Sequence, residues 1–381
     1  MEERIARTEN ISPFIVMEVL EKAQAMQARG EDVIHLEVGE PDFPTPEPVK
    51  EAAIRALKDN DTHYTHSLGK LALREEIARY YWQRFRVEIS PEQVMVTMGT
   101  SPAMLLVFSV LLQKGDELIL PNPYYACYPN FVHYLDAQPV YVPVNDEDGF
   151  QYRIEEIRAR LGPATRAILV NSPANPTGMV CTAAQLQELA ELPRPIVSDE
   201  IYSGLVYEGE EHTILEYSQD AFVINGFSKL FAMTGWRLGY IIVPRRYIRP
   251  LQILQQNLFI CASSFCQEAG IAALRYCQTE VEDMRRIYDQ RRLYVLQRLE
   301  EMNLATVSKP TGAFYALADL RHISNDSYKL AFDILQEAKV ALTPGIDFGS
   351  NCEGYLRLSY ANSLENIKEG LDRLQRYLAL R

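Results

Sequence analysis

The sequence predicts an α/β fold with two parts. The large part is a mostly parallel seven-stranded sheet flanked by helices, and a smaller α+β domain is formed by both chain ends. Short β-branched apolar runs alternate with helical patterns in the middle of the chain. These runs are apolar at nearly every position, as in strands buried on both faces. The two ends instead carry long amphipathic patterns, which indicates a separate packing unit.

Seven apolar runs supply the expected sheet. They are bounded by Pro, Gly or Asn, as strands of this kind are. The runs are Val94–Met98, Glu117–Leu120, Val140–Val144, Arg166–Val170, Pro195–Ser198, Phe222–Asn225 and Tyr240–Val243. Helical patterns follow between them, including Pro102–Gln113 and Thr182–Leu192. Thr182 stands three residues before Gln185, which predicts a capping box at the start of the second helix.

The chain ends predict the smaller domain. Met17–Arg29 is an amphipathic helix that stops before Gly30, and Val281–Met302 repeats apolar residues at helical spacing. Three strand-like runs then surround a helix at Ser327–Ala338, and they are Gly312–Leu320, Val340–Thr343 and Tyr355–Tyr360. We therefore place the large domain at residues 42–276, and the small domain at residues 1–41 and 277–381.

Composition excludes several classes of function. The chain has 38 Lys and Arg against 51 Asp and Glu, a net charge of −13, so neither nucleic acid nor an anionic membrane surface is an expected partner. No apolar run approaches the roughly 20 residues that span a bilayer, and the N-terminal residues lack a signal-peptide pattern. The six cysteines form no CxxC pair, which favours a reducing compartment. We expect a cytoplasmic protein.

Familiar nucleotide and metal motifs are absent from the sequence. There is no GxxxxGK[ST], no GxGxxG after a strand and no HExxH. His63 and His66 lie close together in sequence, but nothing supplies a third ligand, so no metal site is expected.

Polar clusters instead follow the predicted strands, where ligands collect in doubly wound sheets. Thr100 and Ser101 open a helix, where hydroxyls and backbone N–H groups suit a phosphate or simply cap the helix. Asp199 follows a buried strand and is either a cap or a site residue. Lys229 also ends a buried strand, which is costly unless the amine has a chemical task. Arg237, eight residues later, offers a planar fork for an anion.

Together these segments resemble the fold-type I pyridoxal-phosphate enzymes, specifically the class I/II aminotransferases. The resemblance covers nearly the whole chain in the family's order. Its segments are Gly39-Glu-Pro-Asp42, Pro121-Asn-Pro-Tyr-Tyr125, Asn171-Ser-Pro-Ala-Asn-Pro-Thr-Gly178, Ser228-Lys229 and Tyr355-Leu-Arg-Leu-Ser359.

The resemblance implies a role for each residue that meets the cofactor ring. Lys229 would hold pyridoxal 5′-phosphate through a Schiff base and later move protons, and Asp199 would pair with the pyridine nitrogen. Asn175 and Tyr202 would hydrogen-bond the phenolic oxygen. Tyr125 would stack on the ring. Lys229, Asp199 and Tyr202 are thus the implied catalytic residues.

The same resemblance implies the phosphate and substrate contacts. The phosphate would be held by Thr100, Ser101 and Arg237, together with Tyr64 from the neighbouring subunit of a homodimer. The substrate α-carboxylate would be bound by Arg357, with Gly39 and Asn175 beside it. Many relatives carry a phosphate-binding serine where this chain has Gly226, and Ser228 is the candidate replacement.

The implied activity is transfer of an amino group between an L-amino acid and a 2-oxo acid by ping-pong chemistry. Two enzyme alternatives remain open at this point, an aspartate aminotransferase and a pyridoxal-phosphate carbon–sulfur lyase, since both share the lysine, the aspartate and the carboxylate-binding arginine. A ligand-sensing transcription regulator is disfavoured because it needs a basic DNA-binding module.

The amino donor is predicted to be neutral, and hydrophobic or aromatic. Aspartate-preferring relatives often carry a lysine where this chain has Ser101, and hydroxyl residues in the N-terminal segment. Here that segment offers Phe14, Ile15 and Val16, which cannot hydrogen-bond a second carboxylate. Desolvating that charge without a partner costs several kcal/mol.

Overall fold

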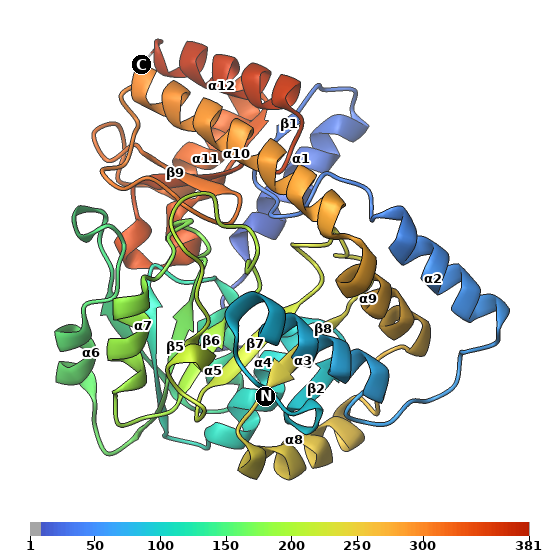
Figure 1. Cartoon of the computed structure of the whole chain (residues 1–381). Coiled ribbons are helices and arrows are strands. Elements are labelled where there is room, and N and C mark those ends of the chain that lie inside the picture. Colours follow the sequence, from blue (N-terminus) through green and yellow to red (C-terminus); the bar gives the residue numbers. More distant parts are fainter. Residues whose placement is uncertain (1–8, 381) are drawn as a thin grey trace, which may run out of the picture.

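A computed structural model describes residues 9–380, and a seven-stranded sheet lies at the centre of the larger part (Figure 1). The strand order is β2-β8-β7-β6-β5-β3-β4. The strands are β2 (Val94–Thr97), β3 (Glu117–Asn122), β4 (Gln138–Pro143), β5 (Thr165–Asn171), β6 (Ile196–Asp199), β7 (Phe222–Gly226) and β8 (Gly239–Ile242). Strand β8 runs opposite to the other six strands. The predicted mostly parallel sheet is confirmed, and each predicted run overlaps one strand.

Both faces of this sheet are covered, as the continuous apolar runs indicate. Along β7, the side chains of Phe222 and Ile224 pack into one hydrophobic cluster, which includes Val107. Val223, between them, packs into a second cluster on the other face with Leu186. Successive side chains of a strand point to opposite faces, so a strand with no polar position needs cover on both.

Helices pack around the sheet and supply that cover. They are α2 (Glu47–Lys58), α3 (Leu71–Phe85), α4 (Thr100–Leu111), α5 (Cys127–Tyr134), α6 (Ile154–Arg160), α7 (Ala183–Ala190), α8 (Arg245–Leu258) and α9 (Ser264–Tyr276). Of these, α2 packs mainly on α9 rather than on the strands. Helix α7 starts with the predicted capping box. The Gln185 N–H donates to Thr182 Oγ1 at 3.3 Å and the Thr182 N–H donates to Gln185 Oε1 at 3.1 Å.

The two chain ends pack together beside the large sheet. Their elements are α1 (Ile15–Ala28), β1 (Ile34–His35), α10 (Gln278–Glu301), β9 (Tyr315–Asp319), α11 (Ser327–Ala338), β10 (Val340–Ala341), β11 (Thr343–Pro344), β12 (Tyr355–Ser359) and α12 (Leu364–Leu378). Strand β1 pairs parallel with β10, while β11, β12 and β9 form an antiparallel sheet. In Figure 1, α10 and α12 lie side by side at the top. The division into domains at residues 42 and 276 stays a prediction.

One predicted strand is wrong in its extent. The run Val340–Thr343 is expected to be a single strand, but Val340 and Ala341 pair with β1 whereas Thr343 and Pro344 pair with β12. The run therefore crosses from one small sheet to another.

Between residues 9 and 380, no helix combines the length and the apolar character that crossing a bilayer requires.

Candidate active site

A cavity of about 310 Å³ lies at the carboxyl ends of the parallel strands. Residues that follow β2, β3, β5, β6 and β7 line it, and a segment before α2 and strand β12 close it from the smaller part of the chain. This is where parallel sheets bind ligands. The structure brings eleven of the predicted site residues to this cavity: Gly39, Thr100, Ser101, Tyr125, Asn175, Asp199, Tyr202, Ser228, Lys229, Arg237 and Arg357.

Lys229 reaches into the cavity from the turn after β7. Its Nζ donates a hydrogen bond to the Gly39 carbonyl oxygen at 2.7 Å. Burial lowers the pKa of Lys229 to about 8; Arg357 and Arg237 act in the same direction, and Glu40 and Asp199 oppose them. An amine with this pKa can take up and release a proton near neutral pH.

Asp199 ends β6 and is held from two sides. The Tyr128 hydroxyl donates to Oδ2 at 2.6 Å, and the Ile201 N–H donates to Oδ1 at 3.1 Å. Burial raises the pKa of Asp199 to about 6, although both hydrogen bonds and Lys229 oppose that rise. The carboxylate is therefore costly to ionise until a cation or a further donor meets it.

Tyr128 is a site residue that sequence reasoning missed. It lines the cavity from α5 and is fully buried. Its ring meets the Tyr125 ring edge-on, with centroids 5.3 Å apart. Tyr125 precedes α5 by two residues and Tyr128 lies in its first turn, so helical spacing in the sequence does not show that the two rings meet.

Two asparagines tie the ends of neighbouring strands together. Asn171, at the end of β5, donates to the Asp199 carbonyl oxygen at 2.9 Å. Its Oδ1 accepts from the Asn175 N–H at 2.8 Å. The loop that carries Asn175 is therefore fixed relative to Asp199, and Asn171 is a second lining residue that the prediction did not assign.

An anion site is formed where α4 begins. Gly99 has φ +89°, and a Cβ on it would lie 2.5 Å from Arg237 Nη2. A Cβ on Gly239 would in turn lie 2.8 Å from the Gly99 carbonyl carbon. Glycine at both positions lets the Arg237 guanidinium approach the helix N-terminus, beside Thr100 and Ser101. Backbone N–H groups, hydroxyls and a guanidinium in this arrangement suit a phosphate.

The structure gives a reason for the glycine at position 226. A Cβ on Gly226 would lie 3.0 Å from the Leu238 carbonyl oxygen and 3.1 Å from the Gly239 Cα, so a serine there requires a shift of the backbone. Ser228 lines the cavity, whereas Gly226 does not. That Ser228 takes over the phosphate contact stays a prediction.

Arg357, in β12, is a buried cation that faces the cavity. Its Nη1 donates to Asn175 Oδ1 at 2.9 Å, and its Nη2 donates to Thr343 Oγ1 at 3.2 Å and to the Glu37 carbonyl oxygen. Its Nε has no partner among the described residues. The guanidinium lies 4.3 Å from the Tyr315 ring centroid. Arg357 lines the cavity, and a buried guanidinium that has an unused donor suits a carboxylate.

Tyr202 and Tyr315 form a second polar contact at the cavity. Their hydroxyl oxygens are 2.6 Å apart. A Cβ on Gly39 would lie 1.9 Å from the Tyr315 hydroxyl, so only glycine allows this approach. Tyr315 was not predicted as a site residue because it lies in a strand that reads as ordinary core.

The N-terminal segment closes one side of the cavity, with one difference from the prediction. Phe14, Val16 and Met17 line the cavity. Ile15, which was expected to face the substrate, is not a lining residue and instead packs with the cluster of α1 and α11. That part of the prediction is wrong, because α1 begins at Ile15 and turns successive side chains in different directions. The Asp347 carboxylate accepts from the N–H groups of Ile15 and Val16.

Tyr64, a predicted cofactor contact, does not line this chain's cavity. Its side chain is 82% exposed, on the loop between α2 and α3. The expectation that it reaches the phosphate of another subunit stays a prediction.

The cavity suits a phosphate-bearing cofactor and a carboxylate, and comparison with known proteins gives the class of enzyme. The family profile described as aminotransferase class I and II matches residues 31–374. The chain belongs to this family, whose members use pyridoxal phosphate, and the protein is an aminotransferase.

Relatives cover the full length of the chain but differ in name. The (5-formylfuran-3-yl)methyl phosphate transaminase of Methanocaldococcus jannaschii is 41% identical, over 97% of this chain and 98% of its own. The aromatic-amino-acid aminotransferase 2 of Thermococcus litoralis is 37% identical, over 98% and 97%. The structure of Thermus thermophilus aspartate aminotransferase with maleate matches with a TM-score of 0.94 at 37% identity, covering 99% of this chain and 100% of that one.

Proposed function

We propose that this aminotransferase holds pyridoxal phosphate on Lys229 and transfers the amino group of a neutral L-amino acid, hydrophobic or aromatic, to a 2-oxo acid. The observation that supports it is the charge of the cavity. Its lining contains three cations, Lys229, Arg237 and Arg357. Lys229 would bind the cofactor's aldehyde, Arg237 its phosphate, and Arg357 the substrate's α-carboxylate. Among residues 9–380, no lining cation then remains for a second carboxylate.

The residues present fit pyridoxal phosphate. The glycine cradle at Gly99 and the Arg237 guanidinium suit its phosphate, and the buried carboxylate of Asp199 suits a protonated pyridine nitrogen. The cofactor, when bound, supplies an electron sink for the charge left by the broken Cα–H bond. Asn175 and Tyr202 would donate to its phenolic oxygen, and Tyr125 would cover its ring.

The chain's own groups then perform the proton chemistry. Asp199 keeps the pyridine nitrogen protonated by remaining ionised beside it. Once the substrate amine has displaced Lys229 from the cofactor, the freed Nζ, with a pKa of about 8, would take the proton from the substrate Cα and deliver it to the cofactor carbon C4′. Arg357 holds the α-carboxylate in one orientation, because a guanidinium binds a carboxylate through two parallel hydrogen bonds.

The wall that meets the substrate side chain favours a neutral donor. Phe14, Val16 and Met17 are apolar, and Glu40, which also lines the cavity, would repel a second carboxylate. The relatives' names include both aspartate and aromatic amino acids. The amino-donor preference proposed for this chain therefore rests on the residues that line its own cavity.

The first experiment tests the role of Lys229. The purified protein is expected to absorb in the visible range, and borohydride is expected to abolish that band and fix the cofactor to Lys229, as peptide mapping would show. Lys229→Ala should retain bound cofactor and lose transamination. Turnover retained in that variant would contradict the assignment.

The second experiment tests the donor preference. We expect kcat/KM for phenylalanine, leucine or alanine to exceed that for aspartate. Aspartate preferred by tenfold, about 1.4 kcal/mol, would overturn the preference and leave the assignment of Lys229 intact.

A homodimer with shared sites is part of the proposal. Tyr64, Leu258 and Ile260 are exposed apolar side chains from two segments that meet, since Gln252 donates to Ser67 Oγ at 3.0 Å. An apolar surface of this kind suits a second copy of the chain.

Complementation tests the shared site. Lys229→Ala and Tyr64→Ala chains are refolded separately and together. The mixed sample should be more active than either alone, because one site of a mixed dimer then has both Lys229 and Tyr64. An active monomer on dilution would remove Tyr64 from the site.

A further inference from the structure

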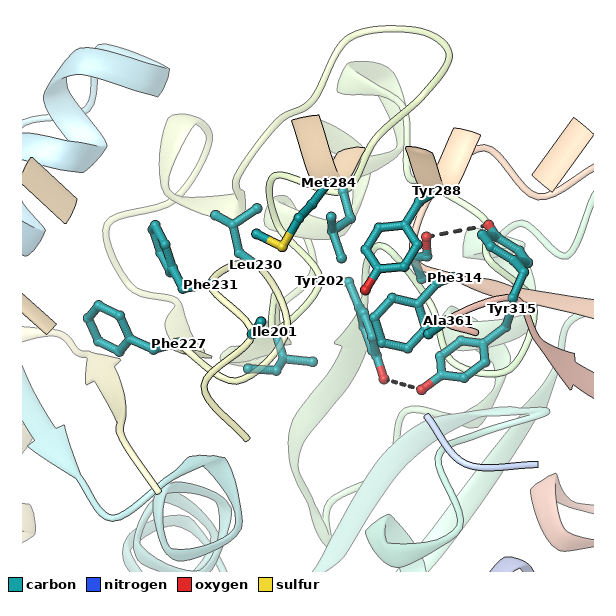
Figure 2. Close-up of a cluster of buried hydrophobic side chains, with 14 of the residues drawn as sticks. Ile201, Tyr202, Phe227, Leu230, Phe231, Met284, Tyr288, Phe314, Tyr315 and Ala361 are labelled. Atoms are coloured by element: carbon teal, nitrogen blue, oxygen red, sulfur yellow. Dashed lines mark hydrogen bonds between the residues drawn. The ribbon is translucent and has the colours of Figure 1, made fainter. Parts of the chain in front are cut away.

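Tyr202 and Tyr315 form a buried phenol pair at the edge of the cavity (Figure 2). Tyr202 follows β6 in the large sheet, and Tyr315 begins β9 in the smaller part. Their side chains are 4% and 1% exposed, and their rings meet edge-on at 5.5 Å. The hydroxyl–hydroxyl contact of 2.6 Å therefore joins the two parts of the molecule where the cofactor is expected to bind.

The position of Tyr315 is tightly determined. The Arg357 guanidinium lies over its ring at 4.3 Å, and the Phe314 ring packs against it at 5.0 Å. Its hydroxyl lies against the Gly39 Cα, where no other residue fits. Within residues 9–380, Tyr202 is the one hydrogen-bond partner that the Tyr315 hydroxyl has. The Tyr315 hydroxyl is thus fixed in position and makes one hydrogen bond within these residues.

A count of protons determines the direction of this contact when the cofactor is bound. A phenol carries one O–H proton and can accept through its oxygen. If Tyr202 donates to the phenolic oxygen of pyridoxal phosphate, it has no proton left for Tyr315. The proton between the two tyrosines must then come from Tyr315. Burial raises the pKa of Tyr315, but the Arg357 charge over the ring opposes that rise and favours Tyr315 as a donor.

We propose, on the basis of the function proposed above, that Tyr315 is a positioning residue that donates its proton to Tyr202, so that Tyr202 gives its own to the phenolic oxygen of pyridoxal phosphate. A hydroxyl that accepts a hydrogen bond becomes a stronger donor. The pair therefore stabilises the ionised phenolic oxygen more than Tyr202 alone does, and it holds Tyr202 in the orientation that donation requires.

Removal of one hydroxyl tests the proposal. In Tyr315→Phe, the pH at which the visible absorbance of the cofactor-loaded protein changes should rise by about 0.5 unit, since the ionised oxygen loses support. The phenylalanine ring still lies under Arg357, so KM for the amino donor should change by less than about twofold. Tyr315→Leu removes the ring as well and should raise KM in addition.

Tyr288→Phe is the matched control. Tyr288 is a fully buried tyrosine of the same aromatic cluster, 5.4 Å from Phe314 (Figure 2), and its hydroxyl has no hydrogen-bond partner among the described residues. Loss of this hydroxyl should leave the absorbance transition unmoved. An equal shift in both variants would mean a general effect of repacking and would overturn the proposal.

A double variant shows whether Tyr315 affects the cofactor through Tyr202 or independently of it. If Tyr315 acts through Tyr202, Tyr202→Phe and Tyr202→Phe/Tyr315→Phe should shift the transition equally. Additive shifts, or no shift in Tyr315→Phe, would overturn the inference. The proposed function fails by a different result: a wild-type protein in which borohydride attaches no cofactor to Lys229.

Discussion

Asp199 and Glu200 are consecutive in sequence, but they lie in different surroundings. Asp199 faces the cavity and accepts from Tyr128 and Ile201. Glu200 points to the other face of the sheet, where its carboxyl group accepts from the Ser198 hydroxyl at 3.0 Å, the Thr213 hydroxyl at 2.9 Å and the Ile214 N–H at 3.1 Å. Burial raises the pKa of Asp199 to about 6 and that of Glu200 to about 8.

The difference shows that burial of a carboxyl group does not by itself mark a functional site. Glu200 has the larger pKa shift, but its donors come from β6, which ends just before it, and from the turn at 213–214, and it does not line the cavity that Asp199 faces. Its hydrogen bonds tie that turn to the sheet. Asp199 has fewer hydrogen-bond donors, and one side of its carboxylate is open to the cavity. A bound ligand can therefore supply the further donor or the positive charge that the protein itself does not provide.

The largest expected effect is a difference in reaction rate between variants of Asp199 and of Glu200. Asp199→Ala should lower the rate of the amino-transfer half-reaction about 10²–10³-fold, because the pyridine nitrogen loses its counter-charge. Glu200→Gln should remain within about twofold of wild type. Single-turnover absorbance with one amino donor measures both. Near-normal rates in Asp199→Ala would show that another group holds the nitrogen.

The second prediction concerns stability rather than rate. Glu200→Ala should lower the free energy of unfolding by about 3 kcal/mol, because the buried Thr213 hydroxyl and Ile214 N–H lose their acceptor. Urea unfolding of the cofactor-free protein measures the loss. The folded variant should keep its kcat. A fall in kcat without a change in unfolding would place Glu200 in the site after all.

The third prediction uses the pH dependence that burial imposes on Asp199. Its native pKa of about 6 is above the unfolded value of 3.8, so the associated stability is present below pH 3.8 and is lost as the pH rises through 6. Asn does not titrate. Asp199→Asn should therefore make the cofactor-free protein roughly 3 kcal/mol more stable than wild type at pH 7.5, with little difference at pH 4. Thermal unfolding at the two pH values tests this, and a constant difference would contradict it.

The smallest expected effect is on cofactor affinity, and it tests whether Tyr128 supports Asp199. Tyr128→Phe removes one donor to Asp199 and should weaken binding of pyridoxal phosphate about tenfold, or 1.4 kcal/mol. Absorbance titration of the cofactor-free protein gives the Kd. Tyr124→Phe is the control, because Tyr124 stacks on Tyr141 outside the cavity. Equal weakening in both variants would argue against a specific contact with Asp199.

The strands of the large sheet were predictable because each is a buried apolar run. Where a strand lies at an edge, the pattern is weaker: β4 begins at the exposed Gln138, two residues before the predicted run. The split at Val340–Thr343 was not predictable, since both halves are apolar and buried. Only their partners, β1 and β12, distinguish them.

Local sequence determined the fold class and the motifs that supply Lys229, Asp199 and Arg357, because burial periodicity and short motifs are properties of neighbouring residues. The tertiary structure alone decided which side chains meet. Tyr128 reaches Asp199 across 71 positions and Tyr202 reaches Tyr315 across 113. Such contacts depend on how the strands cross over and on how the chain ends pack against the sheet. No local pattern of hydrophobicity encodes them, since a tyrosine that donates to a catalytic group and one that only fills the core occupy the same kind of buried position.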